Sequence, residues 1–101
     1  MIATRVPLAL LAFAVICVNA LAAESEPPPG AAQCTGCHAA SAKVDSAIPR
    51  LAGRTAADIV AQMQAFKSGE KPSTVMGRLA KGFSETEVQA IAEWYAQQKE
   101  R

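Results

Sequence analysis

Apolar residues in the second half of the chain recur with helical spacing. Ile59, Met63 and Phe66 fall at positions i, i+4 and i+7, which places them on one face of a helix. Thr55 is a suitable N-cap before this stretch, and Gly69 after it is suited to a left-handed helix end. The pattern therefore predicts a helix between Thr55 and Gly69, with one face packed against the rest of the fold.

A second apolar stripe lies near the C-terminus. Ser84 and Glu87 have the spacing of a capping box, so a helix is predicted to begin at Ser84 and to run to about Lys99. Its buried stripe is expected to consist of Val88, Ile91, Ala92 and Tyr95.

The rest of the chain gives weaker signals. A short alanine-rich helix is expected from Ala31 to about Ala40, followed by a loop over residues 41–54. Residues 70–83 are interrupted by a proline and two glycines, so they are expected to form a loop with one helical turn at 78–80. No stretch alternates with a period of two residues. The sequence therefore predicts an all-α domain.

The N-terminus has the features of a secretory signal peptide. Arg5 precedes an apolar run, and Ala20-Leu21-Ala22 supplies small residues at the positions that a signal peptidase reads. Residues 1–22 are assigned to this leader, with cleavage after Ala22 or Ala23, which predicts a periplasmic protein without a membrane anchor. Cys17 is assigned to the leader as well. The alternative is an uncleaved anchor, because residues 6–23 just reach the length of about 18 residues that can span a membrane.

The mature chain is predicted to be one small domain. Residues 23–30 contain three consecutive prolines and are expected to form an extended tether, which leaves residues 31–101 as the folded domain. A chain of this size buries little apolar surface, and such domains commonly need a disulfide, a metal or a cofactor.

Charge excludes one class of partner. From residue 24 onward, nine acidic residues balance nine basic ones, so nucleic acid is not expected to bind. A late basic cluster is either a solvated face or a docking surface for a partner protein; it consists of Lys67, Lys71, Arg78 and Lys81.

Residues 34–38 read Cys-Thr-Gly-Cys-His, which is the attachment pattern of c-type haem. Cys34 and Cys37 are spaced to bond the two vinyl groups of one porphyrin, and His38 can then ligate the iron. Three other readings are weaker. A dithiol redox centre needs a preceding strand, a structural zinc needs four ligands, and a disulfide across four residues adds little stability.

The sixth iron ligand decides what such a haem does. The chain has one histidine, so the candidates are the thioethers of Met76 and Met63. Met76 is favoured because it lies in a glycine-containing loop, whereas Met63 lies on the apolar stripe of a helix, where methionine commonly fills gaps. A His/Met pair closes both axial positions and suits an electron carrier, not a catalyst. An iron without Met76 would instead suit a ligand-binding or peroxidatic protein.

His38 also needs a hydrogen-bond acceptor for its second ring nitrogen. The carbonyl of Pro49, in the loop that follows, is the expected acceptor.

Together these residues resemble the small class I cytochromes c. The resemblance rests on the haem motif, the Ile-Pro-Arg-Leu-Ala-Gly stretch at 48–53, the Met76 loop and a closing helix with Trp94 and Tyr95. It implies three main helices and loops wrapped around one covalent haem. It also implies that the Pro49 carbonyl accepts from His38 and that Met76 is the sixth ligand.

Residues 66–70 and 74–84 carry a narrower resemblance, to the cytochrome subunit of flavocytochrome c sulfide dehydrogenase. This resemblance implies a flavoprotein partner that carries FAD, oxidises sulfide and passes electrons to the haem, with a downstream cytochrome or oxidase as acceptor. No flavin-binding sequence is present in this chain, which would then be the electron-transfer subunit. The alternative is a free soluble cytochrome that carries electrons to a terminal oxidase or another acceptor.

Overall fold

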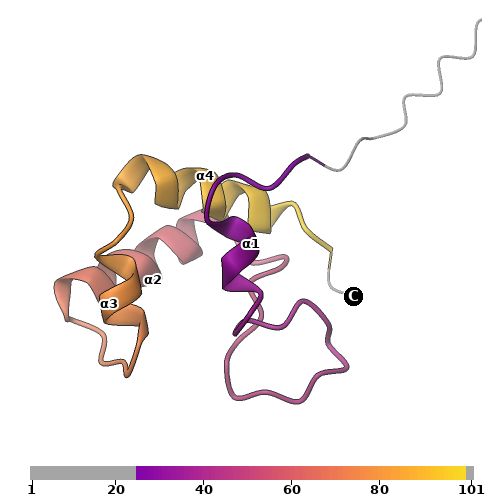
Figure 1. The fold of residues 1–101 in the computed structure, drawn as a ribbon, viewed down its shortest axis with the longest axis horizontal. Coiled ribbons are helices and arrows are strands. Elements are labelled where there is room, and N and C mark those ends of the chain that lie inside the picture. The colour runs from indigo at the N-terminus through magenta and orange to yellow at the C-terminus, as the bar shows by residue number, and fades with distance from the viewer. Residues whose placement is uncertain (1–24, 100–101) are drawn as a thin grey trace, which may run out of the picture.

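The computed structural model describes residues 25–99. The expected signal peptide and the first two residues of the expected tether lie outside this range. Four helices follow one another in the described part: α1 (Ala31–Cys34), α2 (Ala56–Ser68), α3 (Met76–Ala80) and α4 (Glu85–Ala96) (Figure 1). Residues 25–99 contain no strand, which confirms the all-α prediction for this part of the chain.

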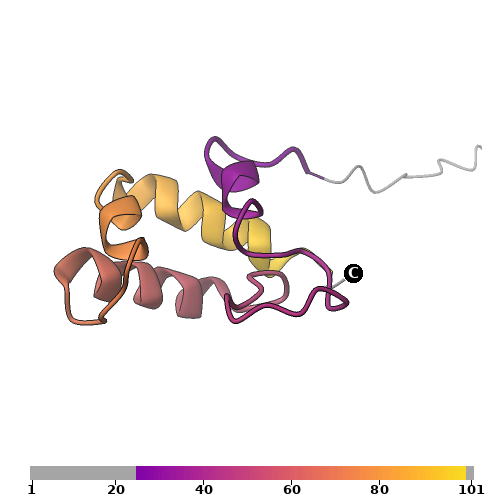
Figure 2. The ribbon, with the colours of Figure 1, turned by 60° about the horizontal axis from the view of Figure 1, so that its bottom comes forward.

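The two long helices form the body of the fold. α2 and α4 lie against each other and run in opposite directions, and the short α3 packs on α2 near the turn between them (Figure 2). α1 packs on α4 towards its C-terminal end. Residues 35–55, which include the long loop 41–54, connect α1 to α2.

Local caps place α2 where the sequence predicts it. The Thr55 hydroxyl accepts a hydrogen bond from the Asp58 backbone N–H at 3.1 Å. At the other end Gly69 adopts a left-handed conformation with φ of 81°, which is strained for residues that carry a Cβ. The predicted bounds of this helix are confirmed, and its apolar face packs on α4.

The predicted start of α4 is also confirmed. The Ser84 hydroxyl accepts from the Glu87 N–H at 3.2 Å, and the four stripe residues are all buried: Val88, Ile91, Ala92 and Tyr95. The helix ends at Ala96, three residues earlier than predicted. No glycine or proline marks this end, so the apolar pattern alone could not locate it.

The two short helices differ from the sequence prediction. α1 ends at Cys34, and the chain continues in single turns through Gly36, a residue that disfavours helix. α3 begins at Met76, whereas one turn was predicted only at 78–80. The Ser73 hydroxyl accepts from the Gly77 N–H at 2.8 Å and so helps to start α3 early. Met76 therefore lies on a helix and not in a loop.

The hydrophobic core is thin. Its cluster of buried residues consists of Ala31, Ile59, Ile91, Ala92 and Tyr95. Partly buried side chains pack around this cluster, among them Cys34, Leu51, Met63 and Phe83. Among residues 25–99, no large side chain is fully buried. The protein part of the core thus supplies limited burial for a domain of this size.

Within residues 25–99, every helix is too short or too polar to cross a lipid bilayer.

Candidate cofactor site

The cysteine motif begins on α1 and continues into the turns that follow it. Cys34 is the last residue of α1 and is half-buried, and its Sγ lies 3.5 Å from the Gly30 carbonyl oxygen. Cys37 is exposed. The Cys37 and His38 N–H groups both donate to the Cys34 carbonyl, at 3.2 and 2.8 Å. These bonds wind residues 34–38 into one compact unit, with the two thiols free of any disulfide.

The two thiols differ in their surroundings. Burial raises the pKa of the Cys34 thiol, and a hydrogen bond with Tyr95 only partly offsets this effect. Cys34 therefore stays protonated to higher pH than an exposed thiol, and a protonated thiol is a poor nucleophile. This environment fits a cysteine held against the core better than a reactive dithiol pair.

His38 is brought together with Pro49, eleven residues further along. The His38 Nδ1 atom lies 2.5 Å from the Pro49 carbonyl oxygen. A carbonyl can only accept, so in this contact Nδ1 carries the proton, and it is Nε2 that has no proton when the ring is neutral. Bare Nε2 is the atom that can bind a metal while its partner nitrogen fixes the ring.

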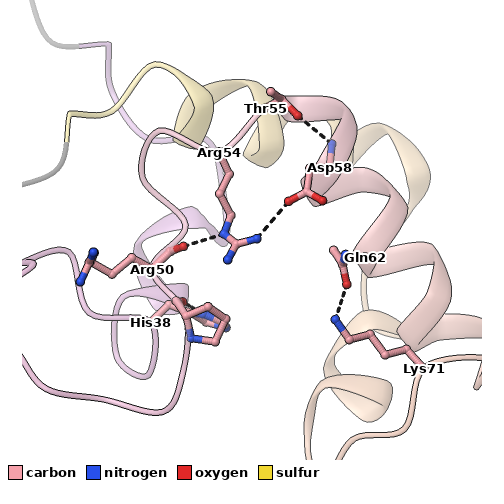
Figure 3. Close-up of polar contacts among 8 residues, drawn as sticks. His38, Arg50, Arg54, Thr55, Asp58, Gln62 and Lys71 are labelled. Carbon is pink, nitrogen blue, oxygen red and sulfur yellow. Dashed lines mark hydrogen bonds and ion pairs between the residues drawn. The ribbon is translucent and has the colours of Figure 1, made fainter.

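The loop that carries Pro49 is tied to both long helices. The Gly53 N–H donates to the Tyr95 carbonyl at the end of α4, at 3.1 Å. Arg54 donates to the Arg50 carbonyl and pairs with Asp58 at the start of α2 (Figure 3). The acceptor of the His38 hydrogen bond therefore sits in an anchored segment, although the side chains around it are exposed.

The two candidate thioethers occupy different environments. Met63 lies on α2, is partly buried and packs against the core cluster. It also lines a cavity of about 170 Å³ between α2 and α4, together with Val60, Phe83 and Val88. Met76 is the first residue of α3, half-buried and outside that cluster.

Four large apolar side chains are exposed on the 41–54 loop and on or next to α3. Val44 and Ile48 are 51% and 43% exposed on the 41–54 loop, and Val75 and Leu79 are 55% and 49% exposed next to Met76 and on α3. An open cavity of about 400 Å³ is lined by Val44, Ile48 and Pro49 among others. A thin core and four large exposed apolar side chains are compatible with a fold that packs around a large apolar group.

Among residues 25–99, no group of three or more His, Cys, Asp or Glu side chains is arranged to hold a metal ion. A haem iron requires no such group, because the porphyrin supplies four of its ligands and the protein only the axial ones. The donor set of residues 34–38 fits that requirement, with two thiols for covalent attachment and one imidazole whose Nε2 is available to a metal.

The chain is homologous to a cytochrome subunit of sulfide dehydrogenase. That protein, from Chlorobaculum tepidum, is 40% identical over 62 residues, which are 61% of this chain and 56% of the relative. Proteins named thiosulfate dehydrogenase electron acceptor are similar as well. The one from Stutzerimonas stutzeri is 39% identical over 68 residues, and the one from Thiomonas intermedia is 36% identical over 74. The resemblance to the sulfide dehydrogenase cytochrome subunit is thereby confirmed.

The matches cover only part of each relative. This chain spans about half the length of the sulfide dehydrogenase subunit and about a third of the two thiosulfate dehydrogenase acceptors, with 56%, 32% and 34% of each covered. The matches to the Stutzerimonas stutzeri and Thiomonas intermedia proteins cover 63% and 71% of this chain. No protein-family profile matches the chain.

One part of the site was missed from the sequence. Arg54 and Asp58 form an ion pair, in which the distance between Arg54 Nη1 and Asp58 Oδ2 is 3.0 Å. The pair lies next to the Pro49 and Arg50 segment through the bond from Arg54 to the Arg50 carbonyl. Opposite charges four residues apart are a recognisable signal for a local ion pair, although the order here, with the basic residue first, is the weaker one. The bond from Arg54 to the Arg50 carbonyl, which connects this pair to the site, has no such local signal.

Proposed function

We propose that this chain is an electron-transfer protein with one haem c, attached through Cys34 and Cys37 and ligated by His38 and Met76. The observation that carries the proposal is the contact between His38 Nδ1 and the Pro49 carbonyl oxygen. It engages Nδ1 and so leaves Nε2 as the ring nitrogen available to a metal, directly after two unpaired cysteines, and it provides the hydrogen bond from the other ring nitrogen that a ligand histidine needs. The homology to a cytochrome subunit supports the same cofactor.

The position of Met76 supports its choice over Met63 as the second axial ligand. Met63 packs against the core cluster, so using it as a ligand would remove a side chain from the contact between α2 and α4. Met76 makes no part of that cluster and lies beside the exposed Val75. Because Gly77 is fixed by Ser73, Met76 sits at a defined helix start that can hold a ligand in place.

A haem bound in this way would gain and lose one electron. The protein's residues would then serve to hold it: Cys34 and Cys37 would bond it covalently, and His38 and Met76 would supply the two protein ligands of its iron, which would leave no open position for substrate. The chain would therefore act as an electron-transfer subunit without catalysing a reaction by itself.

The partner that we propose is a flavoprotein dehydrogenase, which carries FAD and oxidises sulfide. The support is the homology to a subunit of sulfide dehydrogenase. Electrons would pass from the flavoprotein to the haem and on to a downstream cytochrome or oxidase. We place this activity in the periplasm, because the first 22 residues have the features of a cleaved signal peptide.

A second candidate function is a free soluble acceptor that meets its dehydrogenase only transiently. The two relatives named as electron acceptors of thiosulfate dehydrogenase favour this reading. For a transient encounter the late basic cluster becomes the candidate docking surface. Two of its ammonium groups already make contacts: Lys67 donates to the Phe83 carbonyl and Lys71 donates to the Gln62 side chain. Arg78 and Lys81 are then the residues to test.

The two functions separate in one experiment. The haem-loaded protein is mixed with a purified flavoprotein sulfide dehydrogenase subunit and, separately, with a thiosulfate dehydrogenase. The rate of haem reduction is followed on adding sulfide or thiosulfate. A stable complex that elutes as one species and is reduced by sulfide supports the first function. Reduction by thiosulfate without a stable complex, slowed steeply by salt and by Arg78→Gln with Lys81→Gln, supports the second. No reduction in either mixture would contradict both.

A further inference from the structure

A bridge of polar contacts connects the start of α2 to the loop segment that contacts His38. Arg54 Nε donates to the Arg50 carbonyl oxygen at 2.9 Å, and Arg54 Nη1 lies 3.0 Å from Asp58 Oδ2. Asp58 is itself fixed, because its backbone N–H donates to the Thr55 hydroxyl at 3.1 Å. Figure 3 shows that the Arg54 guanidinium reaches from the helix start towards the loop that carries Arg50, near the His38 ring.

The Arg50 carbonyl is the next one along the chain after the carbonyl of Pro49, which contacts His38 Nδ1. The two carbonyls belong to successive planar peptide units that meet at the Cα of Arg50, so once the Arg50 carbonyl is held, the Pro49 carbonyl can move relative to it only by rotation about φ and ψ of Arg50. We propose that Arg54 is a positioning residue: by bridging the Arg50 carbonyl and the Asp58 carboxylate, it holds the Pro49 carbonyl against His38 Nδ1.

Other contacts fix the loop at a later point. The Gly53 N–H donates to the Tyr95 carbonyl, and the Arg54 N–H donates to the Leu51 carbonyl. These bonds hold residues 51–54, but the carbonyl at Arg50 is held through the Arg54 side chain. Removal of that side chain should therefore loosen residues 49–50 while the turn at Gly53 stays in place.

The chemistry of the bridge requires arginine. A guanidinium offers several N–H donors in one rigid plane, so it can donate to a carbonyl and to a carboxylate at the same time. Lysine at this position would keep the positive charge but would offer one flexible ammonium group. The bridge is about 40% exposed at both charged side chains, so water competes for its bonds and a moderate effect is expected.

This inference rests on the proposed function, since it concerns the histidine that we assign as an iron ligand. The readout is the exchange rate of the His38 Nδ1 proton with solvent, measured by NMR on the reduced haem-loaded protein. Arg54→Gln, Arg54→Lys and Asp58→Ala are compared with the parent protein. Lys43→Gln is the matched control, because it removes one positive charge from the same loop without touching the bridge.

Arg54→Gln and Arg54→Lys are both expected to raise this exchange rate, by about three- to tenfold, and Asp58→Ala by less. Lys43→Gln is expected to match the parent. Equal rates in the parent and both Arg54 variants would overturn the inference, as would an increase in Arg54→Gln that Lys43→Gln reproduces. The absorption spectrum distinguishes failure of the proposed function from failure of this inference alone. A parent that binds no haem contradicts the proposed function and this inference with it, whereas a red parent with an unchanged Arg54→Gln variant contradicts this inference alone.

Discussion

Tyr95 donates a hydrogen bond from its phenolic hydroxyl to the carbonyl oxygen of Ala31, which lies 64 positions earlier in the chain. Both residues are buried, at 3% and 0% exposed. The bond joins the end of α4 to the start of α1, which carries Cys34. One polar contact inside the core thus holds α1, and with it the start of the Cys34–His38 motif, against the end of α4.

Tyr95→Phe should destabilise the protein, because it leaves the buried Ala31 carbonyl without this donor. We expect the free energy of unfolding to fall by about 1 to 3 kcal/mol, measured by chemical denaturation of the haem-loaded protein. Thr35→Val is the matched control, since it removes an exposed hydroxyl that donates to the Ala32 carbonyl of α1. A loss no larger for Tyr95→Phe than for Thr35→Val would show that the buried bond contributes nothing extra.

The same tyrosine should make stability depend on alkaline pH. Burial raises the pKa of Tyr95 above its ordinary value of 10.0. The contribution of the protonated Tyr95 to the free energy of unfolding is therefore fully present below about pH 10. Above it the unfolded tyrosine loses its proton while the folded one keeps it, so stability falls by up to about 1.4 kcal/mol per pH unit. Denaturation curves between pH 8 and 11 should show this fall in the parent relative to Tyr95→Phe. Parallel curves would contradict it.

Alanine substitutions at Gly30 and Gly69, which both have positive φ, distinguish the cost of backbone strain from the cost of a steric clash. A Cβ on Gly30 would lie 2.8 Å from Phe83 Cε1, whereas a Cβ on Gly69 would meet nothing within 4 Å. Gly69→Ala should cost about 1 to 2 kcal/mol for the left-handed conformation alone. Gly30→Ala should cost about 1 to 3 kcal/mol more, and Phe83→Leu should recover part of that difference in the double variant. Thermal unfolding measures all three, and equal losses at both glycines would rule out the clash.

Met76→Ala should change ligand binding at the iron, whereas Met63→Ala should mainly lower stability. Loss of Met76 should open an axial position, so that the reduced protein binds carbon monoxide at neutral pH while the parent does not. Loss of Met63 should leave the site closed and cost packing, about 2 to 5 kcal/mol of stability. The absorption spectrum under carbon monoxide and a denaturation curve distinguish them. Binding by Met63→Ala alone would assign the ligand to α2, and binding by the parent would favour a ligand-binding haem protein.

The well-predicted parts of the fold have local causes. α2 is delimited by Thr55 and Gly69, each of which acts within one turn of its own position, and the buried stripe of α4 follows directly from apolar spacing. The bounds of α1 and α3 depend on weaker features. The Ser73 hydroxyl helps to start α3 at Met76, and Gly36 disfavours continuation of the helix after Cys34 although alanines precede and follow the motif.

The candidate site also has parts that local sequence signals predict and a part that they do not. The spacing of Cys34, Cys37 and His38 is readable because the chemistry that it predicts is confined to one turn. The contact between His38 and Pro49 was expected as well, and the structure brings the two residues together. The Arg54 bridge was missed, because its bond to the Arg50 carbonyl depends on how the loop folds back onto α2. The assignment of Met76 as an iron ligand remains a prediction.

Mass spectrometry of the haem-loaded chain tests the central claim most directly. The chain is produced together with a bacterial haem-ligation system, purified and digested. The expected result is a red protein in which a single haem is covalently attached to the peptide containing Cys34 and Cys37, with none on a Cys34→Ser, Cys37→Ser double variant. A colourless protein with both thiols unmodified would contradict the claim.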